Sequence, residues 1–403
     1  MFKPLYVCLD AHDDAIENEV LSEVARVKML AAKSASELSD SDLSEASVVA
    51  VWHTIWIDQP LLARLPRCVA IVRMGVGYDN VDIAAAGRLG ISVCNIPDYG
   101  TEEVADSALG LTLGLFRGAL AGTRLLHEYA EVRGADAIAA AVPYVRRVRG
   151  SVLGLIGLGR IGTALALRAK ACGFDVVFFD PYREDGSEKA IGIRRATTMA
   201  ELLRVSDCVS LHANVVSAGV SAEESHAAPQ KMLNADAFRQ MKRGALLVNT
   251  ARGEIIDEVA LCKLLSSRVE PCLPLPPPRS LTHHPPATST LAGVGEALKS
   301  GQVGAAALDV HWDEPWKRDE GPLSEAPNLF CCPHQAWFSP ESRAEMRRKG
   351  AQAAHRALFA EFETSSIQLR HLLRNVVNAS LLDEQQMRER LVAERTRQQE
   401  GLP

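Results

Sequence analysis

The sequence has no apolar run approaching the roughly eighteen residues that a bilayer-spanning helix needs. Its first residues lack the basic, apolar and cleavage regions of a secretory signal peptide, and a strand-like run starts at Leu5. The nine cysteines form no CxxC pair, and most lie in apolar runs, as buried thiols do in a reducing compartment. We therefore expect a cytoplasmic protein with no membrane partner, and the sequence leaves entry into the nucleus open.

An excess of basic charge is also missing, since 44 Lys and Arg stand against 50 Asp and Glu for a net charge of −6. Proteins that bind nucleic acid usually carry a basic face, so no direct nucleic-acid partner is expected. His283 and His284 have no Cys or acidic neighbour, so no metal site is predicted. At 403 residues the chain exceeds one comfortable core, and two soluble domains are expected.

The most informative stretch that is present runs from Val152 to Asp180. An apolar run leads into a GxGxxG motif, a helical pattern follows, and a second apolar run ends on an acid. This order is typical of a dinucleotide site, in which glycines permit the tight turn and the helix N-terminus holds the phosphates. An acid at this point accepts hydrogen bonds from a ribose and repels a 2′-phosphate, which favours NAD over NADP. The predicted contacts are Gly157, Gly159, Arg160, Ile161, Gly162 and Asp180.

Short β-branched runs alternate with helical patterns along most of the chain, which predicts an α/β fold with parallel sheets. We expect two Rossmann-like domains: a flavodoxin-like substrate domain and a doubly wound NAD-binding domain of six strands inserted into it. One spanning helix is expected over 101–128. The predicted boundaries are 1–98 plus 335–380 for the substrate domain, 99–334 for the NAD-binding domain, and 381–403 for a charged, solvated tail.

Two stretches interrupt this alternation. Residues 215–230 are small and polar, and form a longer connection than strands and helices usually need. Residues 271–286 contain seven prolines and divide what would otherwise be one helix. We predict an extruded insertion over about 268–293, and the sequence leaves open whether it is a true loop or a translated intron.

Three motifs near the carboxyl ends of late strands carry complementary groups: NTARG, DVHWDEP and PHQAW. Because the carboxyl ends of parallel strands share one edge of a sheet, Arg252, Glu314 and His334 are expected to converge there. A guanidinium can clamp the carboxylate of a 2-oxo acid, and an imidazole can protonate the new alkoxide. We therefore predict Arg252 as the clamp, His334 as the acid and base, and Glu314 as the group that orients the imidazole and favours its protonated form.

The motifs GLGRIG, DPY, VNTARG, LDVHxxEP and CPHQAW, in this order, resemble those of the D-isomer-specific 2-hydroxyacid dehydrogenases. Within that family, the C-terminal-binding-protein branch is the one that this chain resembles in LRAKACGFDVVFFDPY, SDCVSLH, VNTARGEIIDE, AALDVHWDEPW and PHQAWFS. The resemblance implies NAD as cofactor and a homodimer. It also implies a substrate loop over 72–80 and a linking helix that starts at 101. The nicotinamide and substrate contacts that it implies are Thr101, Ala213, Thr250, Ala251, Arg252, Asp309 and His334 for the cofactor, with Asp309 on the carboxamide, and Arg73, Val76, Gly77, Arg252 and Trp337 for the substrate.

The function expected first is therefore an NAD-dependent oxidoreductase that interconverts a 2-oxo acid and a D-2-hydroxy acid. Trp337 beside the catalytic imidazole suggests a pocket for an apolar substrate side chain. An NAD(H)-sensing corepressor scaffold that binds peptides of transcription regulators is the alternative from another class. A formate or phosphite dehydrogenase would share Arg252 and His334, but Glu314 argues against it, because formate dehydrogenases of this fold typically carry Gln there.

Overall fold

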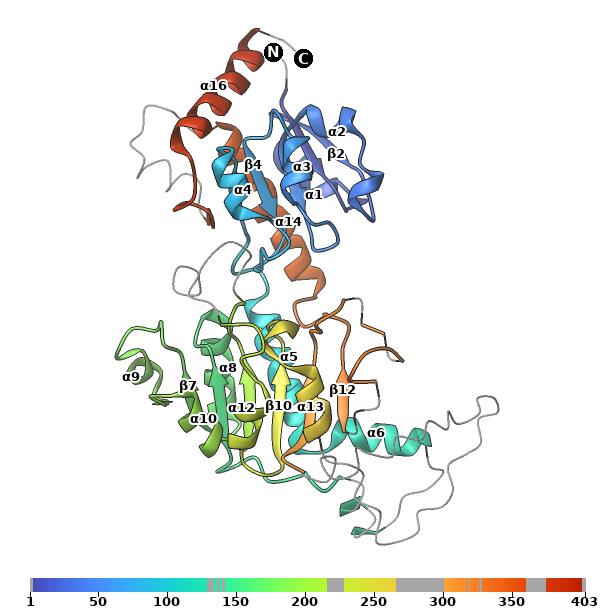
Figure 1. The fold of residues 1–403 in the computed structure, drawn as a ribbon, viewed down its shortest axis with the longest axis vertical. Coiled ribbons are helices and arrows are strands. Elements are labelled where there is room, and N and C mark those ends of the chain that lie inside the picture. The colour runs from blue at the N-terminus through green and yellow to red at the C-terminus, as the bar shows by residue number, and fades with distance from the viewer. Residues whose placement is uncertain are drawn as a thin grey trace. The chain divides into compact units, whose positions relative to one another are not determined.

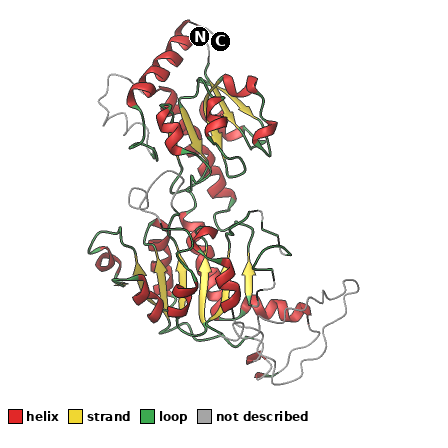
Figure 2. Ribbon diagram, viewed as in Figure 1, coloured by secondary structure: helices red, strands yellow, loops and turns green. Residues whose placement is uncertain are grey.

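The computed structural model describes residues 3–128, 134–135, 138–139, 142–215, 228–265, 301–314, 316–317, 319–324, 326, 328–359 and 375–400. The predicted insertion and most of the 215–230 connection lie outside the described residues. The chain divides into two compact units, each built on a parallel sheet (Figures 1 and 2). Unit 1 holds the described parts of 1–100 and 338–403, and unit 2 those of 101–215 and 226–337.

The division between the units falls after Gly100 and Trp337, where we expected 98 and 334. The second difference has a visible cause. The carbonyl oxygen of Ala336 accepts a hydrogen bond from Ser107 Oγ at 3.1 Å, and the Ala336 N–H donates to Asp309 at 2.9 Å. Both partners belong to unit 2, so this turn is fixed there.

Unit 1 has a five-stranded parallel sheet in the order β2-β1-β3-β4-β5, which is the flavodoxin-like order. Its apolar strands are buried, as expected for a sheet covered by helices on both faces. The elements of its N-terminal part are β1 (Leu5–Cys8), α1 (Ala15–Leu21), β2 (Arg26–Met29), η1 (Ala35–Glu37), α2 (Asp40–Ser44), β3 (Ala46–Val51), α3 (Gln59–Ala63), β4 (Ala70–Arg73), α4 (Ile83–Arg88) and β5 (Ser92–Cys94).

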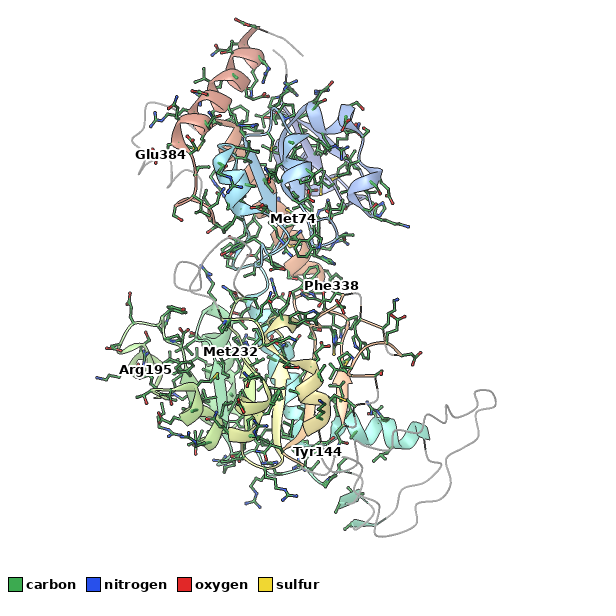
Figure 3. The ribbon with its side chains drawn as sticks, viewed as in Figure 1. Met74, Tyr144, Arg195, Met232, Phe338 and Glu384 are labelled. Atoms are coloured by element: carbon green, nitrogen blue, oxygen red, sulfur yellow. The ribbon has the colours of Figure 1, made fainter. Side chains whose placement is uncertain are left out.

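Helix α14 (Pro340–Phe359) returns from the far end of the chain to complete unit 1. Met74, which follows β4 and is labelled in Figure 3, packs its sulfur against Gly350 of this helix. Helix α14 is also joined to α1 by a buried ion pair, in which Arg347 donates from Nε and Nη2 to the carboxylate of Glu17. A buried pair of this kind is costly to break, because the remaining charge would have no partner.

The predicted solvated tail over 381–403 was wrong for residues 384–400. They form helix α16 (Glu384–Glu400), which buries Met387, Leu391 and Glu394. The carboxylate of Glu394 accepts a hydrogen bond at 2.6 Å from the hydroxyl of Ser47, at the start of β3. Charged residues spaced around α16 conceal this short apolar stripe, so the sequence alone suggests a solvated helix.

Arg390 adds a second set of hydrogen bonds between α16 and the rest of unit 1. Its guanidinium donates to the main-chain oxygens of Leu65, Cys68 and Leu89 at 2.6 to 3.2 Å. These carbonyl groups lie outside helices and strands, and the arginine supplies hydrogen bonds that regular secondary structure does not give them. Helix α16 is therefore an integral part of unit 1.

Unit 2 has a seven-stranded parallel sheet in the order β12-β11-β10-β9-β6-β7-β8, one strand more than predicted. The additional strand β8 has only two residues and lies at the edge. The elements are α5 (Thr101–Phe116), α6 (Ala119–Glu128), β6 (Val152–Ile156), α8 (Arg160–Ala171), β7 (Asp175–Phe179), α9 (Ser187–Ile191), β8 (Arg194–Arg195), α10 (Met199–Val205), β9 (Cys208–Leu211), α12 (Ala235–Gln240), β10 (Ala245–Asn249), η2 (Gly253–Ile255), α13 (Glu258–Leu264), β11 (Val303–Leu308) and β12 (Leu329–Cys331).

The single helix predicted over 101–128 is two helices in the structure, α5 and α6, which meet at a bend of 62° (Figure 1). The bend lies at Gly118, whose φ of +64° is in the left-handed region that ends helices. In the part of the chain that the structure describes, no single helix is long and apolar enough to cross a membrane. The bent pair of α5 and α6 reaches the required length and hydropathy only when its two helices are counted together.

Candidate active site

The loop after β6 has the close packing that a dinucleotide-binding turn requires. Gly157 has φ +95°, and a Cβ atom there would lie 2.7 Å from the carbonyl carbon of His212. A Cβ atom on Gly162 would lie 2.4 Å from the oxygen of Gly157. Gly159, at the N-cap of α8, faces open space instead, and no side chain caps the helix. The loop is thus tight on the protein side and open above the amides of Arg160 and Ile161, where a pyrophosphate would fit.

Asp180 follows β7 and orders the same loop. Its two carboxylate oxygens accept hydrogen bonds from the amides of Leu158 at 2.8 Å and Tyr182 at 3.0 Å. Each carboxylate oxygen has a second lone pair, so both can also accept from ribose hydroxyls. The geometry is therefore compatible with the ribose contact that the sequence predicts.

The chain after β9 borders this loop, because Gly157 packs against the main chain of His212 and Ala213. His212 is partly buried, and its Nε2 lies 2.8 Å from the hydroxyl of Ser210. Burial lowers the pKa of His212 to about 4, so the imidazole is neutral at physiological pH. The sequence indicated Ala213 at this position but gave no role to His212.

The loop after β10 carries Arg252, and Asn249 at the end of the strand fixes the loop. Asn249 Nδ2 donates to the carbonyl oxygen of Arg252 at 2.8 Å, and Asn249 Oδ1 accepts from the amide of Ala251 at 3.0 Å. Arg252 Nη1 donates to the carbonyl oxygen of Ala251 at 2.7 Å. The hydroxyl of Thr250 is buried and has no hydrogen-bond partner within the described residues, so it can serve a bound nicotinamide.

The turn that holds His334 is built on Asp309, at the end of β11. The carboxylate of Asp309 accepts from the amides of Gln335 and Ala336, each at 2.9 Å, and its carbonyl oxygen accepts from the His334 amide at 2.8 Å. Burial raises the pKa of Asp309, and the two amides offset part of this effect. The structure thus gives Asp309 a role in shaping the turn, whereas its predicted contact with the carboxamide stays a prediction.

His334 and Glu314 form the closest pair of titratable groups in this region, with His334 Nδ1 lying 2.7 Å from Glu314 Oε2. Both side chains are about one-third exposed, at 31% and 32%. Burial alone would raise the pKa of Glu314, but the hydrogen bond and charge of His334 more than offset this and lower it. His334 also has φ +53°, an uncommon conformation for a residue other than glycine.

The predicted substrate residues of unit 1 lie at the end of β4 and in the loop that follows it. Arg73 is buried, and its Nη1 donates to the carbonyl oxygen of Met74 at 3.1 Å. The carbonyl oxygen of Val76, next to Gly77, accepts from Asn95 Nδ2 at 2.7 Å. This loop is therefore held in shape by its own unit.

Within unit 2, the structure brings together the predicted acid-base pair His334 and Glu314. Arg252, Glu314 and His334 each follow one of three neighbouring parallel strands, β10, β11 and β12, as predicted. Trp337 is partly buried in the turn after His334, and Thr101 opens α5. Among the described residues, no three or more His, Cys, Asp or Glu side chains gather in a way that could hold a metal ion.

Sequence reasoning missed a buried histidine beside this pair. The sequence motif predicted no function for His311. Its amide donates to Glu314 Oε1 at 3.2 Å, and its Nε2 donates to the carbonyl oxygen of Cys332 at 3.1 Å. The signal available in the sequence was its position, two residues after a strand-ending acid and three before Glu314.

Comparison with known proteins identifies the family. The family model for the NAD-binding domain of D-isomer-specific 2-hydroxyacid dehydrogenases matches residues 116–270 and 292–336, and so passes over most of the predicted insertion. C-terminal-binding protein 1 of Caenorhabditis elegans is 34% identical over 357 residues, which are 88% of this chain and 43% of that protein. Glyoxylate reductase of Korarchaeum cryptofilum (strain OPF8) is 32% identical over 296 residues, which are 73% of this chain and 75% of that protein. The chain thus spans less than half the length of the first of these relatives.

Solved structures share the fold. D-lactate dehydrogenase of Aquifex aeolicus, complexed with NAD and lactic acid, superposes with a TM-score of 0.69 at 21% identity, over 93% of this chain and 99% of that one. The NADPH-dependent glyoxylate/hydroxypyruvate reductase of Sinorhizobium meliloti, in complex with NADP and malonate, gives 0.65 at 25% identity, over 89% of this chain and 94% of that one. Together with the geometry of the nucleotide loop, these matches confirm a two-domain α/β fold and a domain that binds NAD. The chain belongs to the D-isomer-specific 2-hydroxyacid dehydrogenase family.

Proposed function

We propose that the protein is an NAD-dependent oxidoreductase that interconverts a 2-oxo acid and a D-2-hydroxy acid. The observation that carries this proposal is the hydrogen bond of 2.7 Å between His334 Nδ1 and Glu314 Oε2. Because Nδ1 is engaged with the carboxylate, proton exchange with a substrate falls to Nε2. An imidazole oriented by a carboxylate is the arrangement that general acid-base catalysis requires.

In the direction of reduction, NADH held by the loop after β6 would supply the hydride for the new C–H bond at the carbonyl carbon. The C=O π electrons move to oxygen, and His334 Nε2 gives its proton to that oxygen, so the hydroxy acid leaves with one hydride and one proton gained. Glu314 stabilises the protonated imidazole before transfer. Arg252 binds the substrate carboxylate and carbonyl oxygen and disperses the negative charge that develops on oxygen.

The substrate class that we propose is a 2-oxo acid with an apolar side chain. Trp337 supports this choice, because a partly buried indole beside the catalytic turn offers an apolar surface of large area. Arg73 and the main chain at Val76 and Gly77 would meet the substrate carboxylate. The proposed cofactor preference is NAD rather than NADP, because Asp180 would repel a 2′-phosphate.

The direct test is NADH oxidation by the purified chain, followed by absorbance, against 2-oxo acids from glyoxylate and hydroxypyruvate to longer apolar and thioether side chains. Turnover that rises with apolar chain length would support both the reaction and the role of Trp337. Tight NADH binding without turnover on any member of the panel would contradict the proposal.

A second candidate function is an NAD(H)-sensing corepressor scaffold, and the similarity to C-terminal-binding protein 1 over 88% of the chain favours it. This function would coexist with the same cofactor site. A Pro-x-Asp-Leu-Ser peptide is the probe, and submillimolar binding that depends on NADH would support the scaffold. A scrambled peptide of the same composition is the matched control.

The family also suggests a homodimer, and we propose this assembly for the chain. Light scattering of the purified protein with and without NADH tests it. A mass of a single 43.6 kDa chain at working concentrations would contradict it.

A further inference from the structure

His311 lies where three loops of unit 2 meet. It follows β11 and is 4% exposed. On one side, its main-chain carbonyl group packs against Gly253, which follows Arg252: a Cβ atom at Gly253 would lie 2.0 Å from the His311 carbonyl carbon. On the other side, its ring reaches Cys332, two residues before His334. The loops that carry the clamp and the acid-base pair therefore both contact this one residue.

The ring of His311 makes two contacts that fix its orientation. Nε2 lies 3.1 Å from the carbonyl oxygen of Cys332, and a carbonyl oxygen only accepts, so Nε2 carries the proton. The ring stacks on Trp316 with 5.0 Å between centroids and 19° between planes. Because Trp316 follows Glu314 by two residues, the stack holds the second half of the Glu314 loop.

The main chain of His311 contacts Glu314 directly, since the His311 amide donates to Glu314 Oε1 at 3.2 Å while His334 takes Oε2. The two oxygens of one carboxylate are thus shared between the loop that carries it and the catalytic imidazole. Rotation of the His311 ring away from Cys332 would remove the side-chain bond between the Glu314 loop and the segment that leads to His334, while the main-chain bonds of that segment to Asp309 remain.

A histidine at this position destabilises the folded chain unless the hydrogen bond of its N–H offsets the loss. Its Nδ1 is buried and has no hydrogen-bond partner among the described residues. A buried acceptor without a partner is destabilising, and a phenyl ring would stack on Trp316 without that loss. The bond to Cys332 is the feature that only the histidine supplies.

We infer that His311 is a positioning residue for the 2-hydroxyacid dehydrogenase reaction, which locks the Glu314 loop to the His334 loop through the Cys332 carbonyl group and the Trp316 ring. The inference rests on the proposed function, because it assigns His311 a role in that same site. His311 touches neither substrate nor cofactor in this account and acts through Glu314.

The test compares two variants with a matched control. His311→Phe keeps an aromatic ring for the Trp316 stack but removes the donor, whereas His311→Gln keeps an amide N–H at the distance of Nε2. His355→Phe is the control, because His355 also lies beside an aromatic ring, at 5.0 Å from Phe359, but in unit 1. We expect His311→Phe to lower kcat about tenfold with KM for NADH unchanged, and His311→Gln and His355→Phe to stay within about twofold of the wild type.

Two further measurements separate positioning from general stability. In His311→Phe the alkaline limb of the pH profile for reduction should move to lower pH, because a loosened Glu314 stabilises the protonated imidazole less. In a Glu314→Gln background the same His311→Phe change should have little further effect on kcat, because its route is already removed. Unchanged kcat in His311→Phe, an unmoved pH profile, or full additivity with Glu314→Gln would overturn the inference.

A readout without substrate distinguishes this inference from the proposed function. Carboxyl NMR of the wild-type chain follows the pKa of Glu314, which lies below its usual range. His311→Phe should raise this pKa toward the usual value, and His311→Gln should leave it low. If His311→Phe does not fold, His311→Asn replaces it, since its shorter amide falls short of the Cys332 carbonyl group. An inactive wild type with this NMR pattern would reject the reaction and keep the positioning role, whereas an unmoved Glu314 pKa would reject the role itself.

Discussion

The carbonyl oxygen of Asp309 accepts the amide hydrogen of His334 at 2.8 Å, and the Asp309 carboxylate accepts the next two amides of the same turn. Three consecutive main-chain donors therefore converge on one residue. This arrangement explains how His334 can keep a left-handed φ of +53°, which costs a residue other than glycine about 1 kcal/mol or more. The turn is held by Asp309 and the imidazole is aimed by Glu314.

Replacing Asp309 by Asn should therefore damage the turn more than a change of one atom suggests. The amide side chain has one acceptor oxygen, so one of the two amides at 335 and 336 would face an N–H donor. We expect a loss of about 2 kcal/mol in the free energy of unfolding and at least a tenfold fall in kcat. Urea unfolding and steady-state kinetics check this, and Asp313→Asn, an exposed acid nearby, is the matched control. Wild-type stability in Asp309→Asn would contradict the account of the turn.

His334→Ala should reduce kcat by about 10²- to 10⁴-fold, since it removes the proposed proton donor. The affinity for NADH should stay within about threefold, because the glycine loop and Asp180 are untouched. Fluorescence titration with NADH and turnover on the best 2-oxo acid measure the two effects. Loss of NADH binding together with turnover would show that His334 supports the fold of the site instead.

Glu314→Gln should change the pH dependence of reduction. An ionised carboxylate favours a protonated neighbouring imidazole and a neutral amide does not, so the alkaline limb of kcat/KM should move to lower pH. The low pKa of Glu314 means that the wild-type carboxylate stays ionised well into acid, and that its stabilising contribution is lost only as pH falls through that pKa. A pH profile identical to the wild type would remove Glu314 from the acid-base pair.

Asp180→Ala should weaken NADH binding by about tenfold and leave NADPH binding unchanged or improved, because a negative charge near the ribose is removed. Asp180→Asn is the useful comparison, since it keeps an acceptor for the Leu158 amide without the charge. If both variants retain the wild-type preference for NADH over NADPH, Asp180 does not contact the ribose.

The neutral His212 gives a prediction about stability. Its pKa of about 4 in the folded chain lies below the usual value of 6.5, so the unfolded state binds the proton first as pH falls. The contribution of neutral His212 to the free energy of unfolding should be fully present above about pH 6.5. It should decline toward pH 4, by at most about 3 kcal/mol. His212→Gln should flatten this decline. Urea unfolding at several pH values measures it, and an equal slope in the variant would assign the effect to other groups.

The sequence predicted the strong elements of the fold and the placement of Arg252, Glu314 and His334 after three neighbouring strands, whereas the roles of these residues stay predictions. The GxGxxG loop, Asp180 and the three strand-end motifs are local patterns whose meaning depends on their order. The edge strands β2 and β8 were not predicted. In β2, exposed and partly exposed residues alternate and no face is buried, and β8 has only two residues. Their pairing comes from neighbouring strands that a local pattern does not show.

Contacts between segments that are distant along the chain could also not be predicted from the sequence. The bend at Gly118 depends on a left-handed backbone in a helix-like composition, and Gly118 packs against Val145. The roles of Asp309 and His311 depend on main-chain groups of another loop, which no residue type reveals. The docking of α16 depends on a carboxylate, Glu394, that meets Ser47 only in the folded unit.

The ion pair between Glu17 and Arg347 joins residues 330 positions apart and sets an order for folding during synthesis. The ribosome makes β1 to β5 first, but α14 and α16 leave the exit tunnel only after all of unit 2. At about 5 to 20 residues per second, the strands of unit 1 wait on the order of ten seconds or more for the helices that cover them. In that interval Glu17 lacks its partner Arg347, and the sheet of unit 1 lacks α14, which packs on β3 and β4. A premature stop near the end of the message would therefore harm the part of the protein that was made first.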